Sequence, residues 1–181
     1  MSRIGKRSIS LDSGVDVKQE GNIVAVKGPK GQISLPIGAG FEISIEANTL
    51  QLKPRTEDKK NKSAALYGLY GALIRNAVIG VTKEFTMTLV LVGVGYKVQL
   101  QGEKLVFALG YSHPVEVEAP EYVKVECPDQ TTIVLRSIYK DKLGQFAAYI
   151  KSLRKVEPYK GKGIRNLGQV VKLKAGKTGK K

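Results

Sequence analysis

The 181-residue chain combines 42% hydrophobic residues with a formal net charge of +14, and it contains one cysteine and no tryptophan. This composition suits a folded chain with one sizeable core or two small ones, and it excludes a disordered chain. The single cysteine, Cys127, excludes an internal disulfide and a cysteine-rich zinc site, and we expect its thiol to be reduced.

No segment is predicted to cross or enter a membrane. The longest apolar stretch, residues 89–95, is far shorter than the roughly 20 residues that a membrane-spanning helix needs. The N-terminus is basic, but neither an apolar run nor a small-residue cleavage site follows it, as a secretory signal would require. We therefore expect a cytosolic location or its equivalent.

The first half of the chain is predicted to form several strands followed by one helix. Strand-like segments occupy residues 15–28, 32–37, 41–46 and 49–54. A helix is then expected over residues 63–78, where apolar side chains recur every three or four residues and form one stripe. The stripe consists of Leu66, Leu69, Tyr70, Leu73 and Ala77.

The second half repeats this order of elements. Strand-like segments occupy residues 96–110, 113–118, 122–127 and 132–137, and in the first of them Tyr96, Val98 and Leu100 alternate with polar residues. A second helix follows, with Asp141 as a candidate N-cap. Its predicted buried stripe is Leu143, Phe146, Ala147, Ile150 and Leu153.

The two halves are predicted to be copies of one unit. Their elements come in the same order, and Gly21 and Gly102 occupy equivalent turns 81 residues apart. We expect an α+β fold of two similar domains from an internal duplication, residues 1–82 and 83–181. Each domain would be a small, mostly antiparallel sheet covered on one face by one helix.

The positive charge is concentrated at the C-terminal end. Residues 1–82 carry 12 basic and 7 acidic side chains, residues 83–150 carry 7 and 8, and residues 151–181 carry 11 and 1. So dense a cluster repels itself unless a polyanion neutralises it, which favours a nucleic-acid partner. A solvated basic tail is the alternative. A membrane surface is disfavoured because Pro158 interrupts the segment and no amphipathic face forms.

No catalytic, metal or cofactor site is predicted. The "GKT" at residues 176–178 lacks the first glycine of a phosphate-binding loop, and the glycine pairs at 93–95 and 161–163 lack the third glycine of a dinucleotide fingerprint. His113 is the only histidine, so we interpret it as a loop residue or an RNA contact. Glu116 and Glu118 share one face of a strand, which is more typical of a solvated face than of a metal pair.

The segment "VEPYKGKGIR", residues 156–165, is the predicted binding element. Pro158 ends the second helix, glycines allow close approach of the backbone to phosphate, and lysines and Arg165 supply charge. Tyr159 either stacks on a base or packs beneath the loop, and we slightly favour packing. The candidate nucleic-acid-binding residues are Lys151, Arg154, Lys155, Tyr159, Lys160, Gly161, Lys162, Gly163, Arg165, Lys172 and Lys174.

Three segments carry a resemblance to a known family. "LVGVGYKV" at 91–98, "GYSHPV" at 110–115 and "EPYKGKGIR" at 157–165 closely resemble ribosomal protein L6 of the large subunit, of the bacterial and plastid type. The resemblance covers essentially the whole chain. Two departures from the family pattern are Val156, where proline is usual, and Asn166, where tyrosine is common.

The resemblance implies a structural, non-enzymatic role. Family members consist of two similar α+β domains and bind large-subunit ribosomal RNA at the base of the factor-binding stalk, near the sarcin–ricin loop. Neighbouring ribosomal proteins and translational GTPases would lie close to this monomeric protein, in the cytoplasm or in a plastid stroma. The resemblance also adds further candidate RNA contacts, which are Gly93, Gly95, Tyr96, Lys97, Ser112 and His113.

Two other classes of function remain alternatives. A sequence-reading DNA regulator would need a recognition helix with exposed basic residues, whereas both predicted helices cover sheets. A nucleotide-handling enzyme would need one of the glycine motifs that fail here.

Overall fold

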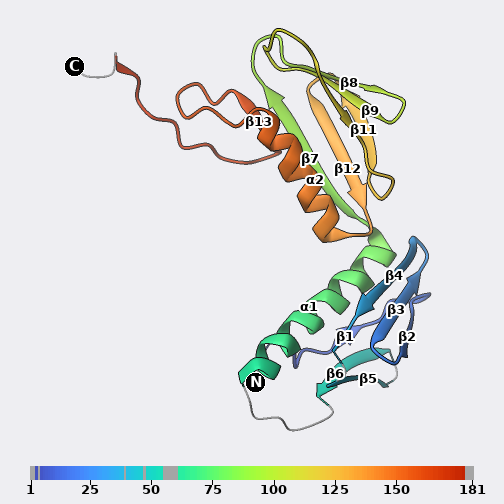
Figure 1. Cartoon of the computed structure of the whole chain (residues 1–181). Coiled ribbons are helices and arrows are strands. Elements are labelled where there is room, and N and C mark those ends of the chain that lie inside the picture. The colour runs from blue at the N-terminus through green and yellow to red at the C-terminus, as the bar shows by residue number, and fades with distance from the viewer. Residues whose placement is uncertain (1–2, 4, 39, 47, 55–60, 178–181) are drawn as a thin grey trace. The chain divides into compact units, whose positions relative to one another are not determined.

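The chain divides into two compact units, Met1–Phe85 and Thr86–Lys181, which are described separately (Figure 1). In this computed structural model, the described residues are 3, 5–38, 40–46, 48–54 and 61–177, without the side chains of residues 61–64.

The strands of the first unit form two small antiparallel sheets instead of the predicted single sheet. The consecutive strands β4 and β5 belong to different sheets. One sheet has the order β2-β3-β4 and the other the order β1-β6-β5. The strands are β1 (Ile9–Ser10), β2 (Asp16–Glu20), β3 (Ile23–Gly28), β4 (Gly31–Pro36), β5 (Phe41–Glu46) and β6 (Thr49–Pro54).

Helix α1 (Asn61–Lys83) packs against strands of both sheets and extends beyond the predicted 63–78. The predicted buried stripe is largely wrong, because Leu66 and Leu69 are 41% and 50% exposed. The helix carries apolar residues around most of its circumference, so periodicity alone could not select the face. The buried face packs closely at Gly28, where a Cβ would lie 2.6 Å from Cγ2 of Val81. The buried side chains are Tyr67, Ile74, Ala77, Val78 and Val81.

Within the described residues, α1 is also the one helix that is long and apolar enough to cross a membrane, over Ala65–Lys83. The core helix of a soluble protein passes the same test. Because one face of α1 covers the sheets of its unit, its composition has an explanation that needs no bilayer.

The second unit again has two sheets, with strand orders β8-β9-β10 and β11-β12-β7-β13. Tyr96 and Val98 are buried as predicted, but Leu100 is 39% exposed, although its partner in the strand pair, Leu105, is fully buried. The strands are β7 (Phe85–Val92), β8 (Lys97–Gln101), β9 (Lys104–Ala108), β10 (Val115–Glu118), β11 (Lys124–Asp129), β12 (Thr132–Ser137) and β13 (Gly163–Asn166).

Helix α2 (Lys140–Leu153) covers β12 and β13. Its predicted stripe is confirmed for the four residues Leu143, Phe146, Ala147 and Ile150, while Leu153 is half-buried. The predicted N-cap is wrong, because Asp141 lies inside the first turn and Tyr139 occupies the cap position without a side-chain hydrogen bond. Lys142 lies over the rings of Tyr122 and Tyr139, at 4.7 and 4.5 Å from their centroids.

The predicted α+β class and internal repeat are confirmed. The sheets β2-β3-β4 and β1-β6-β5 of the first unit correspond to β8-β9-β10 and β7-β12-β11 of the second, and each unit then has one long helix. Gly21 and Gly102 occupy equivalent two-residue hairpin turns with φ of +59° and +63°. Strand β13 has no counterpart in this correspondence, and it belongs to the basic C-terminal segment.

Candidate nucleic-acid interface

The chain leaves α2 through a closed loop at residues 157–162, which we call the cation loop. The amide of Glu157 donates to the carbonyl of Lys162 at 2.8 Å, and the amide of Gly161 donates to the carbonyl of Glu157 at 3.0 Å. Helix α2 already ends at Leu153, and Pro158 lies within the loop, where it has no amide to donate to a helical hydrogen bond. The loop is therefore held in one shape by its own backbone.

Glycines close this loop onto the end of the helix. A Cβ on Gly163 would lie 2.7 Å from the carbonyl oxygen of Lys155 and 2.7 Å from Cα of Val156, both of them backbone atoms. Gly161 and Gly163 have positive φ values of +68° and +140°, and both are buried. A Cβ on Gly161 would meet only Cδ2 of Leu173, at an ordinary contact distance of 3.5 Å. Gly163 therefore has a packing role, and the contact of both glycines with phosphate stays a prediction.

Strand β13 anchors the far end of the cation loop. Gly163 and Arg165 pair with Val92 and Val90 of β7, and the side chain of Ile164 is only 1% exposed. Asn166, which stands where the family pattern commonly has tyrosine, does not interrupt the strand, because it still pairs with Leu89. The loop is thus fixed both at the helix end and, through β13, along four residues of β7.

Arg154 connects this segment with two tyrosines from earlier in the chain. Its Nε donates to the Tyr96 hydroxyl at 3.0 Å, and its guanidinium lies 5.0 Å from the centre of the Tyr111 ring. The Tyr111 hydroxyl donates to the carbonyl of Leu153 at 2.9 Å, which satisfies one of the last carbonyls of α2. Interactions with Tyr111 and then Tyr96 raise the pKa of Arg154, a side chain that is cationic in any case.

A cleft of about 730 Å³ opens beside these residues. Four of the predicted main-site residues line it, and with them lies Tyr96, which the sequence places only among the additional candidates. Four lining residues are absent from the predicted site: Tyr111, Ser152, Leu153 and Glu157. Tyr111 directly precedes the predicted Ser112, and Glu157 lies inside the predicted segment. The lining residues are Tyr96, Tyr111, Ser152, Leu153, Arg154, Lys155, Glu157, Lys160 and Lys162.

The remaining predicted residues lie outside the lining of this cleft. Tyr159 is 53% exposed and does not pack beneath the loop, so the slight preference for packing is wrong. The tail is held against the loop where the amide of Lys174 donates to the carbonyl of Pro158 at 2.8 Å. The others outside the lining are Lys151, Gly161, Gly163, Arg165 and Lys172, with Gly93, Gly95, Lys97, Ser112 and His113. The tail residues Thr178, Lys180 and Lys181 lie outside the described residues.

The turn between β7 and β8 positions one wall of the cleft. A Cβ on Gly93 would lie 2.8 Å from the Tyr96 ring, so only glycine lets this ring lie against the turn. The amide of Tyr96 donates to the carbonyl of Gly93 at 3.2 Å. Gly93 therefore contributes to the cleft by placing Tyr96 and its hydroxyl.

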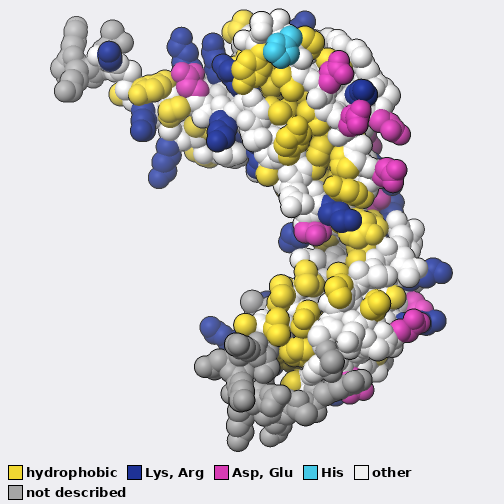
Figure 2. Space-filling view, viewed as in Figure 1, with side chains coloured by type: hydrophobic (Ala, Val, Ile, Leu, Met, Phe, Trp, Pro, Cys, Tyr) yellow, Lys and Arg dark blue, Asp and Glu magenta, His cyan; other side chains and the backbone are white. Residues whose placement is uncertain are grey.

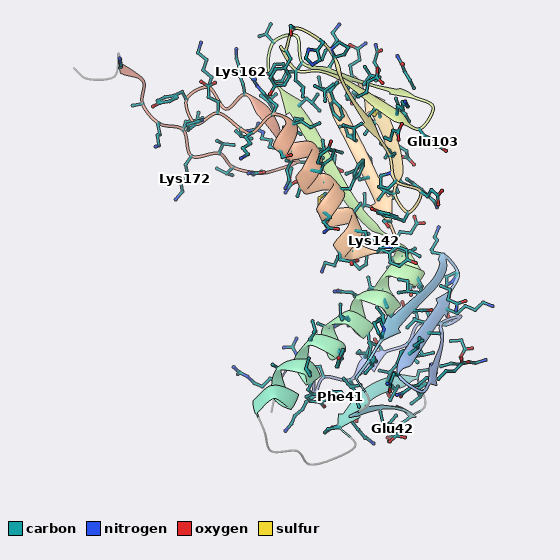
Figure 3. All side chains as sticks on the ribbon, viewed as in Figure 1. Phe41, Glu42, Glu103, Lys142, Lys162 and Lys172 are labelled. Carbon is teal, nitrogen blue, oxygen red and sulfur yellow. The ribbon has the colours of Figure 1, made fainter. Side chains whose placement is uncertain are left out.

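Charge is unevenly distributed over the second unit. Lysines and arginines gather over the C-terminal segment, and acidic side chains gather on the side that carries Glu103 (Figures 2 and 3). Lys162 and Lys172 extend from the basic segment (Figure 3). Among the described residues, no group of three or more His, Cys, Asp or Glu side chains is placed to hold a metal ion. The arrangement is that of a surface for a polyanion.

Comparison with known proteins gives consistent matches along the whole chain. The family described as "Ribosomal protein L6" matches residues 12–84 and 92–166. The "Large ribosomal subunit protein uL6" of Alkaliphilus metalliredigens is 50% identical over 99% of this chain and 100% of its own length. The proteins of the same name from Streptococcus gordonii and Caldicellulosiruptor saccharolyticus are 49% and 46% identical, over 99% of this chain and 100% and 98% of their lengths.

Proposed function

The chain belongs to the ribosomal protein L6 family of the large ribosomal subunit, and from this premise we propose how it binds its RNA. The cation loop, the last turns of α2 and the basic tail bind large-subunit ribosomal RNA. The site on the RNA is near the base of the factor-binding stalk and the sarcin–ricin loop. The role is structural and involves no catalysis.

One observation carries this proposal: Arg154, Lys155, Lys160 and Lys162 line the same cleft. Lysine and arginine that neutralise phosphates release counterions from the RNA, and this release dominates affinity for nucleic acids. The loop is closed by backbone hydrogen bonds and anchored by β13, so little conformational entropy is lost when RNA binds. The charges are preorganised for the phosphates.

The tail extends this surface. Lys172 and Lys174 are exposed, and the hydrogen bond from the amide of Lys174 to Pro158 keeps them on the side of the cation loop. They add phosphate contacts along the RNA without shaping the cleft.

The proposal also includes the oligomeric state, the location and the neighbours of the protein. It acts as a monomer within the ribosome, in the cytoplasm, or in the stroma if the source is a plastid. Neighbouring ribosomal proteins of the stalk base lie beside it, and translational GTPases dock nearby.

Charge removal tests the proposal. In the triple variant, Lys155, Lys160 and Lys162 are each replaced by Gln, and binding to a large-subunit rRNA fragment is titrated from 50 to 200 mM salt. The slope of log K against log salt is expected to fall by about 3, because each phosphate contact contributes about 0.9. The matched control replaces three exposed lysines of the first unit by Gln, namely Lys27, Lys30 and Lys83. It should leave the slope of log K against log salt unchanged.

Two outcomes contradict the proposal. An unchanged slope in the cation-loop variant places the main RNA contact elsewhere. Tighter binding to duplex DNA than to the rRNA fragment points to the DNA-regulator alternative instead.

A further inference from the structure

We infer that the cleft beside Arg154 binds one unpaired nucleotide of the RNA and that Glu157 selects its base, with guanine preferred. This rests on the proposed function, because the nucleotide is part of the bound RNA. It goes further by assigning the cleft a ligand of its own and by giving Glu157 a role in specificity.

The walls of the cleft suit an unpaired base better than a duplex. Tyr111 is 46% exposed at the cleft, and the guanidinium of Arg154 lies against its ring. Unstacked bases of RNA bind on aromatic rings and on arginine planes, whereas paired bases offer only their edges. A volume of about 730 Å³ also falls in the range of small-ligand sites.

The hydrogen bonds of Tyr111 and Arg154 make this wall rigid before any RNA arrives. Tyr111 is fixed by its hydroxyl on the carbonyl of Leu153, and Arg154 is fixed by Tyr96. A preformed stacking surface needs no ordering on binding, which favours one defined base position over a mobile contact.

Glu157 is unexpected in a site for phosphates. Its side chain is exposed and lines the cleft, and in the described part of the chain no ion pair involves it. Closing of the cation loop uses only the backbone of Glu157, which any residue except proline would provide. A carboxylate beside three lysines weakens phosphate binding by repulsion, so its presence needs another explanation.

Base recognition supplies that explanation. An ionised carboxylate only accepts hydrogen bonds, and its two oxygens match a pair of parallel N–H donors. The Watson–Crick edge of guanine offers such a pair, from N1–H and the 2-amino group, whereas uracil offers a single N–H. Lys155, Lys160 and Lys162 line the same cleft and are available to the phosphates that flank the base.

Three RNA hairpins of identical stem sequence test the inference with the full-length protein. One is fully paired, one carries a single bulged guanosine and one a single bulged uridine. We expect the guanosine bulge to bind about tenfold more tightly than the uridine bulge, and the fully paired stem to bind most weakly. Glu157→Gln should abolish the guanosine preference without weakening uridine binding, because it removes a repulsive charge.

Substitutions at Tyr111 test the stacking wall. Tyr111→Leu should remove the preference for bulged over paired RNA, and Tyr111→Phe, which keeps the ring, should retain it. The chain has no tryptophan, so Tyr111→Trp introduces its only indole. The fluorescence of this indole should be quenched by the bulged hairpins and not by the paired one. This measurement remains informative even if the Tyr111→Leu variant does not fold.

The outcomes separate this inference from the proposed function. Equal binding of both bulges by the wild type overturns base selection, as does a guanosine preference that survives Glu157→Gln. Salt-dependent binding that is equal for paired and bulged RNA, with unquenched indole fluorescence in the Tyr111→Trp variant, overturns the nucleotide site but leaves the proposed function standing. Failure to bind any rRNA fragment contradicts the proposed function itself.

Discussion

The two units are built on one plan, and they differ most clearly in the segment after the helix. After α1 the chain continues into β7, the first strand of the next unit, whereas after α2 it forms the cation loop and then β13. Strand β13 lies along β7, which has eight residues, while the equivalent strand β1 has only two. The proposed binding segment therefore lies where the second copy provides a long strand edge.

The charges show the same division. Residues 83–150, most of the second copy, carry 7 basic and 8 acidic side chains, whereas residues 151–181 carry 11 and 1. The first unit, at 12 and 7 over residues 1–82, is only moderately basic. The repeated elements thus form the scaffold, and most of the excess positive charge lies in the C-terminal segment that follows them.

The largest effect on stability is expected from Gly163→Ala, at the start of the added strand. The new Cβ would lie 2.7 Å from backbone atoms of Lys155 and Val156, and φ of +140° is unfavourable for any residue with a Cβ. We expect a loss of about 3–4 kcal/mol from the free energy of unfolding of the second unit. Hydrogen exchange resolved by peptide should show lost protection in β7, β13 and α2, with the first unit unaffected.

Gly168→Ala is the matched control for this substitution. Gly168 also has a positive φ, of +77°, but nothing lies within 4 Å of its Cβ position, so only the backbone cost of about 1 kcal/mol remains. If the two substitutions cost the same, the close packing of the cation loop on the end of α2 does not contribute.

A somewhat smaller loss is expected from Ile164→Ala, which tests whether β13 belongs to the core of the second unit. Its side chain is 1% exposed, and truncating a fully buried isoleucine costs about 3 kcal/mol. Val170→Ala, at a side chain 89% exposed further along the same segment, should be neutral. Urea unfolding measures both. An Ile164→Ala variant as stable as wild type would make β13 an accessory strand that the unit does not need.

Much of the scaffold could be predicted because strand alternation and helical periodicity are local signals. The stripe of α2 is predicted well, since its opposite face is polar and Leu143, Phe146 and Ile150 stand out. The stripe of α1 is not, because Leu66 and Leu69 are as apolar as the buried Ile74. Which apolar face is covered depends on contacts with distant strands, such as that of Gly28 with Val81, and no local pattern records them.

In the candidate site, too, contacts between residues distant in sequence could not be predicted. The charge distribution locates the basic segment, because like charges clustered in sequence remain clustered in space. The aromatic wall is only partly predicted: Tyr96 and Tyr111 reach Arg154 across sequence separations of 58 and 43 residues, and the fold alone brings them together. The sequence assigns Gly161 and Gly163 to phosphate contact, and it gives no sign that Gly163 also packs against the backbone at the end of α2.

The smallest effects compare the two copies directly, through Gly21→Ala and Gly102→Ala. Both glycines occupy the first position of a two-residue hairpin turn, with φ of +59° and +63°, and no atom lies within 4 Å of either Cβ position. The cost is therefore that of a left-handed backbone alone, about 1–2 kcal/mol for each substitution. Hydrogen exchange should register each loss only in the unit that carries the substitution. Unequal losses would point to the second turn residue, which is Asn22 in the first copy and Glu103 in the second, because φ is nearly equal and both Cβ positions lie in open space.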